Sequence, residues 1–400
     1  MRPTSLFLFA HLATARVRYM GVSIAGGDFG CTINGTCPPP QTLLPTTTGP
    51  DQMTHFATTN MLNIFRLPVS WQHLVASTLS GPLIDNTPYY GLLDACLATG
   101  ATCILCIHNF ARWDGAVIGQ SQPPTEVSTA DFVSLWRQLA ARYAATTERL
   151  MFELMNEPHD LDMAQWAETL QAVVAAIRAE GFAGTILLPG TGFSSAGAFL
   201  SSGSADALSK IKNPDGGVEG LVFALHKYLD ADNSGTGAEC VTNNTAAFGE
   251  VADFLRREGR MGLVSETGAP SDGGNGGCLV RFCEQNAYVN ANPDVFLGLV
   301  GWGAGSFGEE YLLSMTPRRE GSVWVDKPVL RDCIVGTWMG STAGVTNLLE
   351  IETTEVEEGG GISTNTTSEA ATEEGKKDAS GRLTASVWVL AACLLAGFVL

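Results

Sequence analysis

The stretch Leu-Met-Phe-Glu-Leu-Met-Asn-Glu-Pro, residues 150–158, decides the fold, because an apolar run ends abruptly in Asn156 and Glu157. A second stretch, Met-Gly-Leu-Val-Ser-Glu-Thr-Gly at residues 261–268, has the same form and carries Glu266 near its end. Each run predicts a short strand that is buried on both faces. A carboxylate beside a core must be paired or neutralised, so packing gives no reason for such a strand to end in one. The two runs therefore predict buried strands whose ends carry functional groups.

Six further apolar segments resemble these two, and helical patterns lie between most of them. In segments 131–144 and 163–179, for example, apolar residues recur at helical spacing. Strand and helix in alternation predict a parallel sheet covered by helices, and closed on itself this sheet is a (β/α)8 TIM barrel of the α/β class. An open doubly wound sheet is the alternative, but no Gly-x-Gly-x-x-Gly turn follows the first strand to support it. The predicted strands are 19–25, 63–69, 102–108, 150–156, 185–189, 221–226, 261–266 and 295–302.

The composition limits the kind of partner. The chain has 400 residues, of which 45% are hydrophobic and 16% charged, with a formal net charge of −18 and a pI near 4.7. This acidity argues against nucleic acid, whose binding requires clusters of Lys and Arg. The sequence has no basic cluster that would favour an anionic substrate either. A neutral polymer is the better match, and since nothing indicates an oligomer, we expect a monomer.

The N-terminus carries a processing signal. The apolar segment 6–10 precedes the small-x-small triplet Ala13-Thr14-Ala15, a pattern typical of a signal peptide that covers residues 1–15. An N-terminal strand or a disordered start is the alternative. Asn34, Asn243 and Asn365 begin tripeptides that match the N-glycosylation pattern. Ten cysteines in a secreted chain predict disulfide bonds.

The C-terminal segment 383–400 ends in an apolar run and follows a polar stretch with small residues, a pattern typical of a glycosylphosphatidylinositol attachment signal. A retained tail helix and an ordinary buried helix are the alternatives. Residues 341–382 are rich in Glu, Thr, Ser and Gly, which predicts a disordered stalk. Residues 16–340 are left as a single catalytic domain. We therefore expect a secreted protein, attached to the cell surface by a lipid anchor that is its one link to a membrane.

Polar and aromatic residues gather at the ends of the predicted strands, where barrel active sites lie. Glycoside hydrolysis requires two carboxylates at such a rim, one to protonate the leaving oxygen and one to attack or to activate water. No metal or other cofactor is expected, because no two histidines share a helix face at ligand spacing. The candidate residues are Arg66, His108, Asn109, Asn156, Glu157, His226, Tyr228, Glu266 and Trp302.

The chain resembles fungal endoglucanases of glycoside hydrolase family 5 over residues 17 to 335. The resemblance implies a retaining double displacement with Glu157 as general acid/base and Glu266 as nucleophile. It further implies that Asn156 binds the sugar 2-hydroxyl, that Arg66 and Tyr228 orient the nucleophile, that His108 and His226 contact the sugars and that Trp302 stacks on a pyranose face. It is carried by Gly-Val-Ser-Ile-Ala-Gly-Gly-Asp-Phe-Gly-Cys (21–31), Ile-Phe-Arg-Leu-Pro-Val (64–69), Ile-His-Asn-Phe-Ala-Arg-Trp (107–113), Met-Asn-Glu-Pro-His-Asp (155–160), His-Lys-Tyr-Leu-Asp (226–230), Ser-Glu-Thr-Gly (265–268) and Gly-Trp-Gly-Ala-Gly-Ser-Phe (301–307).

The two-residue period of a strand predicts the directions in which the cysteine side chains near His108 point. If His108 points into the barrel, Cys106 also points inward and Cys103 outward, toward Cys96 at the end of the preceding predicted helix. Removal of Cys393 with the tail leaves nine cysteines, and we expect Cys106 to be the unpaired one. Cys96–Cys103 is then one disulfide, and the resemblance implies the other three, Cys31–Cys37, Cys240–Cys278 and Cys283–Cys333.

Cys106 is also the point where the sequence departs from the family pattern. The resemblance places an aspartate two residues before His108, at position 106, where it could pair with Arg66. Its loss should change the charges around Glu266, so we expect a changed pH optimum or lower stability.

The leading hypothesis is an endo-β-1,4-glucanase that hydrolyses cellulose or another β-glucan. A mannanase or a transglycosylase of cell-wall β-glucan is the enzymatic alternative on the same site. An inactive glycan-binding surface protein is the non-enzymatic alternative.

Overall fold

The computed structural model describes residues 16–37, 44–76, 78–85, 87–123, 126–272 and 276–340. The expected signal peptide 1–15, stalk 341–382 and tail 383–400 lie outside these residues. Within them, no helix is both long and apolar enough to cross a membrane.

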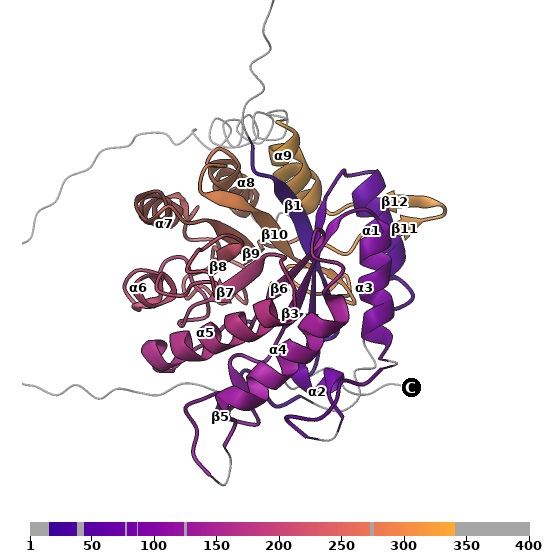
Figure 1. The fold of residues 1–400 in the computed structure, drawn as a ribbon. Coiled ribbons are helices and arrows are strands. Elements are labelled where there is room, and N and C mark those ends of the chain that lie inside the picture. Colours follow the sequence, from indigo (N-terminus) through magenta and orange to yellow (C-terminus); the bar gives the residue numbers. More distant parts are fainter. Residues whose placement is uncertain are drawn as a thin grey trace, which may run out of the picture. The chain divides into compact units, whose positions relative to one another are not determined.

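Eight parallel strands close into a barrel in the order β1-β10-β9-β8-β7-β6-β3-β2, and helices surround it (Figure 1). The TIM barrel predicted from the alternating pattern is therefore confirmed. Two short hairpins, β4–β5 and β11–β12, lie outside the barrel. The barrel strands are β1 Tyr19–Ala25, β2 Ile64–Val69, β3 Thr102–Ile107, β6 Leu150–Glu153, β7 Ile186–Pro189, β8 Leu221–His226, β9 Gly262–Thr267 and β10 Phe296–Gly305, and the hairpin strands are β4 Arg112–Trp113, β5 Ala116–Val117, β11 Arg318–Glu320 and β12 Val323–Val325.

The helices begin and end at recognisable local signals. Ser128 and Asp131 form a capping box at the start of α4, and the side chain of Asp162 caps α5. Gly259 ends α7 in the left-handed conformation, with φ of 61°. The helices are α1 Gly49–Thr58, α2 Trp71–Leu74, α3 Pro88–Ala98, α4 Thr129–Tyr143, α5 Met163–Ala179, α6 Ser204–Leu208, α7 Thr245–Glu258, α8 Gly276–Asn290 and α9 Thr337–Met339, with a π-helix at Val329–Gly336 before α9.

Two strands end three residues away from their predicted ends at the rim that matters for function, while the ends of the other barrel strands there differ by one residue at most. Strand β6 ends at Glu153 rather than at 156, so Asn156 and Glu157 lie in the turn that follows it. Strand β10 continues past Trp302 to Gly305. In the turn after β6, Glu157 takes a positive φ of 46° and has left the strand conformation.

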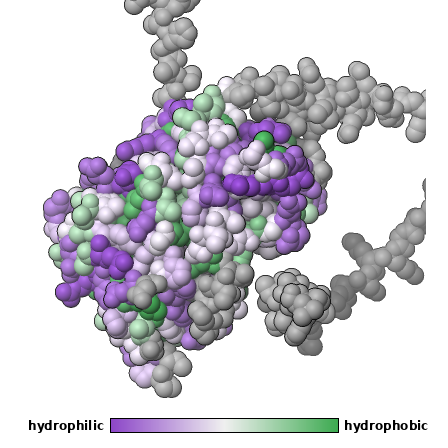
Figure 2. Space-filling view, turned by 90° about the vertical axis from the view of Figure 1, so that its right-hand side faces the viewer, coloured by the Kyte–Doolittle hydropathy of each residue, from purple (hydrophilic) through white to green (hydrophobic). Residues whose placement is uncertain are grey.

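The core has two layers, as expected for a barrel. The larger layer fills the space between strands and helices, and Cys103 belongs to it. The smaller layer lies inside the barrel and includes Ile104 and Cys106, which alternate with Cys103 along β3. Hydrophilic residues predominate on the face that Figure 2 shows, and the hydrophobic residues there are scattered.

Four disulfides connect the pairs Cys31–Cys37, Cys96–Cys103, Cys240–Cys278 and Cys283–Cys333. They are the pairs that the strand period and the resemblance indicate. Cys106 is a buried free thiol.

Candidate active site

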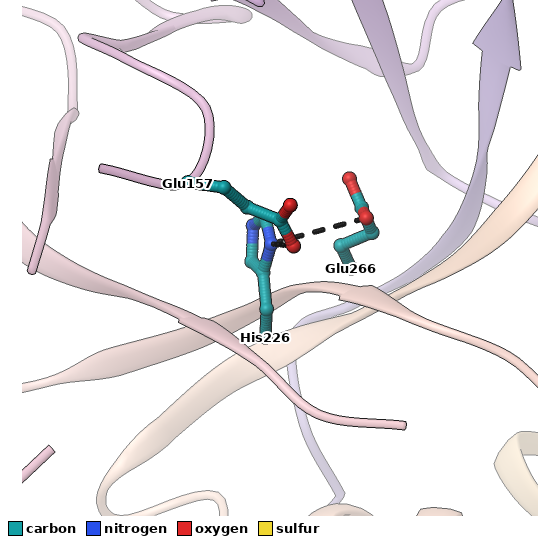
Figure 3. Close-up of side chains that lie close together, drawn as sticks. All are labelled: Glu157, His226 and Glu266. Carbon is teal, nitrogen blue, oxygen red and sulfur yellow. Dashed lines mark hydrogen bonds and ion pairs between the residues drawn. The ribbon is translucent and has the colours of Figure 1, made fainter. Parts of the chain in front are cut away.

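Two carboxylates and a histidine meet at the carboxyl-terminal rim of the barrel (Figure 3). Glu157 follows β6, His226 ends β8 and Glu266 lies on β9. One side-chain N or O atom of each lies within 4.8 Å of those of the other two. The two glutamates predicted from the ends of apolar runs are therefore close enough to act on one bond.

Glu266 is buried, with 5% of its surface exposed, and two donors fix its carboxylate. Arg66 Nη1 donates to Oε2 at 2.6 Å, and the Tyr228 hydroxyl donates to Oε1 at 2.7 Å. Burial raises the pKa of Glu266, while the charges of His226 and Arg66 and the hydrogen bond from Tyr228 oppose that rise. Burial also raises the pKa of Tyr228 well above its ordinary value, so the phenol stays protonated and donates.

Glu157 is the more accessible carboxylate, with 16% of its side chain exposed. Its left-handed backbone is uncommon for a residue other than glycine, and such conformations cluster at functional sites. Its Oε1 lies 2.9 Å from His226 Nδ1. Glu157 is thus partly exposed at the rim, and its carboxylate is held by the buried His226.

His226 is almost fully buried, yet it carries a positive charge at neutral pH. Burial lowers its pKa, but the charge of Glu266 and the hydrogen bonds with Glu153 and Glu157 outweigh burial and raise the pKa to about 9. Its two ring nitrogens therefore both donate, Nδ1 to Glu157 and Nε2 toward Ser265 and Glu153.

Arg66 lies below this rim and binds four groups. Besides Glu266 it donates to Glu153 Oε2 through Nε at 2.5 Å, to Asn156 Oδ1 through Nη2 at 2.6 Å and to Cys106 Sγ through Nη2 at 3.0 Å. Its surface is fully buried, and the surrounding acidic groups raise its pKa although burial alone would lower it. Asn156 Nδ2 is buried and has no partner among the described residues, so it is free to donate to a ligand.

An aromatic wall stands beside the carboxylates. The rings of His108 and Trp302 stack at 5.6 Å between centroids and 18° between planes, and Trp302 Nε1 donates to the Tyr311 hydroxyl at 3.0 Å. Burial lowers the pKa of His108 well below its ordinary value, and the charge of Arg66 lowers it further. His108 is therefore neutral, and its Nδ1 has no partner among the described residues.

Asn109 stabilises the loops around the site and does not belong to the aromatic wall formed by His108 and Trp302. Its Oδ1 accepts from the backbone N–H of Trp71 at 2.7 Å, and its Nδ2 donates to Gln72 Oε1 at 2.7 Å. The residue thus ties the end of β3 to α2. Of the two roles grouped in the prediction, substrate binding and support, these contacts fit support.

Four residues of the site were not predicted from the sequence. Glu153 and Ser265 lie beneath the two catalytic candidates, Tyr311 supports Trp302, and Asp28 Oδ2 lies 4.0 Å from His108 Nε2. Burial raises the pKa of Asp28 to about 6. A signal for Glu153 was present, because a carboxylate in the middle of an apolar strand must find a partner inside the barrel.

Glu157, His226 and Glu266 also have the composition of a metal site. A histidine must be neutral to bind a metal ion. With a pKa of about 9, His226 instead donates hydrogen bonds from both nitrogens. In this structure the three residues therefore form a cluster in which His226 contacts both carboxylates.

Comparison with known proteins agrees with this geometry. The sequence profile of the family "Cellulase (glycosyl hydrolase family 5)" matches residues 33–308. Endoglucanase EG-II of Hypocrea jecorina is 48% identical over 333 residues, which are 80% of this chain and 77% of that protein. Endoglucanase 1 of Saitozyma flava is 40% identical over 75% of this chain and 85% of its own length.

Solved structures give the same result. The crystal structure of Cel5A (EG2) from Hypocrea jecorina is 46% identical and superimposes with a TM-score of 0.76, over 80% of this chain and 98% of that one. The barrel, the pair of rim carboxylates and these similarities agree, and the chain belongs to the cellulase family of glycoside hydrolases, glycosyl hydrolase family 5.

Proposed function

We propose that this protein is an endo-β-1,4-glucanase that cleaves internal bonds of cellulose or another β-glucan with retention of configuration. The observation that carries the proposal is the approach of Glu157 and Glu266, whose carboxylate oxygens lie within 4.8 Å of each other. Retaining glycosidases hold their two carboxyl groups about 5 Å apart, whereas inverting enzymes leave room for a water between them. The two relatives reported above are both named endoglucanases, which supports the same substrate class.

In the first step Glu157 donates its proton to the glycosidic oxygen while a Glu266 oxygen attacks the anomeric carbon. The bond to the leaving sugar breaks, and a covalent glycosyl ester forms on Glu266. Arg66 and Tyr228 hold both Glu266 oxygens, so the attacking carboxylate is charged and correctly oriented before the sugar arrives. The more exposed position of Glu157 suits a group that must reach a leaving oxygen.

In the second step Glu157, now ionised, removes a proton from water, and the hydroxyl attacks the anomeric carbon and frees Glu266. Formation of the ester removes one negative charge from the cluster. Glu157 can then keep its charge beside the protonated His226, 2.9 Å away. The same residue therefore acts first as acid and then as base.

Three further residues contact the sugar in this proposal. The free Nδ2 of Asn156 donates to the 2-hydroxyl, a contact that strengthens in the transition state. Trp302 presents an apolar face to a pyranose ring, and the neutral His108 uses its free Nδ1 for a hydroxyl. Neutral contacts of this kind fit an uncharged polysaccharide.

Three further features remain proposals about the protein in the cell. The four disulfides fit an oxidising compartment and so support secretion. Glycosylation at Asn34 is compatible with its exposed position. A lipid anchor on a monomeric enzyme completes the proposal, and size-exclusion chromatography and phospholipase release from cells would test these points.

The test of the function is hydrolysis by the catalytic domain, residues 16–340, of carboxymethyl cellulose, barley β-glucan and mannan, with Glu266→Gln as the control. Cleavage of the two glucans with a rapid fall in viscosity, abolished in Glu266→Gln, is the expected result. Cleavage of mannan alone would overturn the specificity, and products longer than the substrate would indicate transglycosylation. A folded protein without turnover on any glycan would overturn the enzyme proposal.

A further inference from the structure

We propose that Glu153 is a positioning residue whose buried carboxylate, beneath the rim, holds Arg66 and His226 and so sets the charge and orientation of Glu266 and Glu157. The inference rests on the proposed glucanase function. It concerns a buried group that touches no substrate and acts through the residues that hold Glu157 and Glu266.

The strand register brings positions 106 and 153 together. Cys106 on β3 is the direct partner of Glu153 on β6, and both side chains point into the barrel. Arg66 contacts both, Cys106 Sγ at 3.0 Å and Glu153 Oε2 at 2.5 Å. An aspartate at position 106 and a glutamate at position 153 are thus two ways of presenting one carboxylate to the same guanidinium.

Glu153 reaches each of the two catalytic candidates through one intermediate residue. Its Oε2 pairs with Arg66, whose Nη1 donates to Glu266. Its Oε1 accepts from Ser265 at 2.7 Å and lies 3.5 Å from Nε2 of His226, whose Nδ1 contacts Glu157. A substitution of Glu153 should therefore change the surroundings of both Glu157 and Glu266.

The charge of Glu153 completes a neutral cluster. Burial raises the pKa of Glu153, but Arg66 and His226 outweigh burial and hold it far below its ordinary value, so the residue is ionised. With Glu157 protonated, the charges of Arg66 and His226 balance those of Glu153 and Glu266. Without Glu153 the buried cluster would carry one excess positive charge, which low-dielectric surroundings do not screen.

The charge balance of this cluster predicts the direction in which the pH profile of kcat/KM moves when Glu153 loses its charge. The first step needs an ionised Glu266 and a proton on Glu157, and both carboxylates lie close to His226, which in turn lies 3.5 Å from Glu153. Removal of a nearby negative charge makes each proton easier to lose. Both limbs of the pH profile of kcat/KM should then move to lower pH, by about one unit for a charge in direct contact. Addition of a negative charge at position 106 should move both limbs to higher pH.

The experiment compares the parent with Glu153→Gln, Cys106→Asp and the double variant Cys106→Asp/Glu153→Gln, using full pH profiles of kcat/KM on a soluble cello-oligosaccharide. Cys106→Asn controls for shape without charge, and thermal unfolding shows which variants are folded. We expect an acid shift for Glu153→Gln, an alkaline shift for Cys106→Asp and a return toward the parent limbs in the double variant.

Other outcomes decide against the proposal. Unmoved limbs in folded Glu153→Gln would show that the carboxylate acts only structurally. If that variant does not fold, the double variant still decides, because limbs far from those of the parent would show that position 106 cannot replace Glu153. A parent without turnover on any glucan would instead remove the proposed function, so the two failures are distinguishable.

Discussion

Tyr228→Phe removes a single hydrogen-bond donor from Glu266 and leaves the shape of the side chain unchanged. The Tyr228 hydroxyl donates to Glu266 Oε1 at 2.7 Å, and the residue is 4% exposed. Arg66 still holds the other oxygen at 2.6 Å, so the carboxylate keeps one of its two anchors. The substitution therefore tests what the second donor contributes to the ionised form.

The magnitude follows from the charge on the acceptor. A hydrogen bond to a charged group contributes about 1.5–3 kcal/mol. Since Tyr228 favours the ionised form of Glu266, its loss raises the pKa of Glu266 and moves the acidic limb of kcat/KM to higher pH. On that limb, kcat/KM should fall by about 10- to 150-fold at a fixed pH, because about 1.4 kcal/mol corresponds to a factor of ten. On the plateau, where Glu266 is ionised in both proteins, the loss should be smaller.

The assay is the pH profile of kcat/KM on a soluble cello-oligosaccharide, with Tyr311→Phe as the matched control. Tyr311 is a neighbouring half-buried phenol, but its hydroxyl accepts from Trp302 and no hydrogen bond joins it to Glu266 among the described contacts. The control should therefore leave the acidic limb in place. An equal loss at every pH in Tyr228→Phe, without movement of that limb, would refute the reasoning.

Two further predictions concern stability and metals. Replacement of Cys283 and Cys333 by alanine opens a loop of 50 residues and should lower the free energy of unfolding by about 4 kcal/mol. The same replacement at Cys31 and Cys37, which are six residues apart, should lower it by about 2 kcal/mol. Equal losses in urea unfolding would contradict this loop-entropy argument. Dialysis against a chelator should leave kcat/KM unchanged at neutral pH, because the protonated His226 is not a metal ligand, and a loss that added Mn²⁺ reverses would contradict this.

The sequence was sufficient for the barrel because its signals are local. Strand β8 and helix α5 have the predicted bounds, since each is a short apolar run or a periodic pattern with clear ends. The end of β6 was misplaced by three residues, because hydrophobicity continues through Leu154 and Met155 while the backbone already leaves the strand. Hydrophobic pattern locates a strand but does not determine where its hydrogen-bonded ladder ends.

The rim residues were predictable for a different reason. In a parallel barrel all strands end at the same edge, so polar residues at strand ends must converge without any knowledge of their contacts. The contacts themselves require coordinates, because Asn109 contacts Trp71 and Gln72 rather than the catalytic carboxylates. A residue next to a strand end can serve the scaffold as well as the substrate.

The layer beneath the rim is where the sequence argument was incomplete. The resemblance places an aspartate where Cys106 stands, and from this the sequence predicted a lost charge and a changed pH optimum or lower stability. The register of β3 against β6 changes that interpretation, because Glu153 presents a carboxylate to Arg66 from the adjacent strand. A carboxylate at either position 106 or position 153 can pair with Arg66. A missing charge at position 106 can therefore be interpreted only when the residue at position 153, its neighbour on the adjacent strand, is known. For this site the quantity to compare between relatives is therefore the summed charge of positions 106 and 153 beside Arg66. The double variant Cys106→Asp/Glu153→Gln measures whether this sum, or the position of the charge, sets the pH dependence of the enzyme.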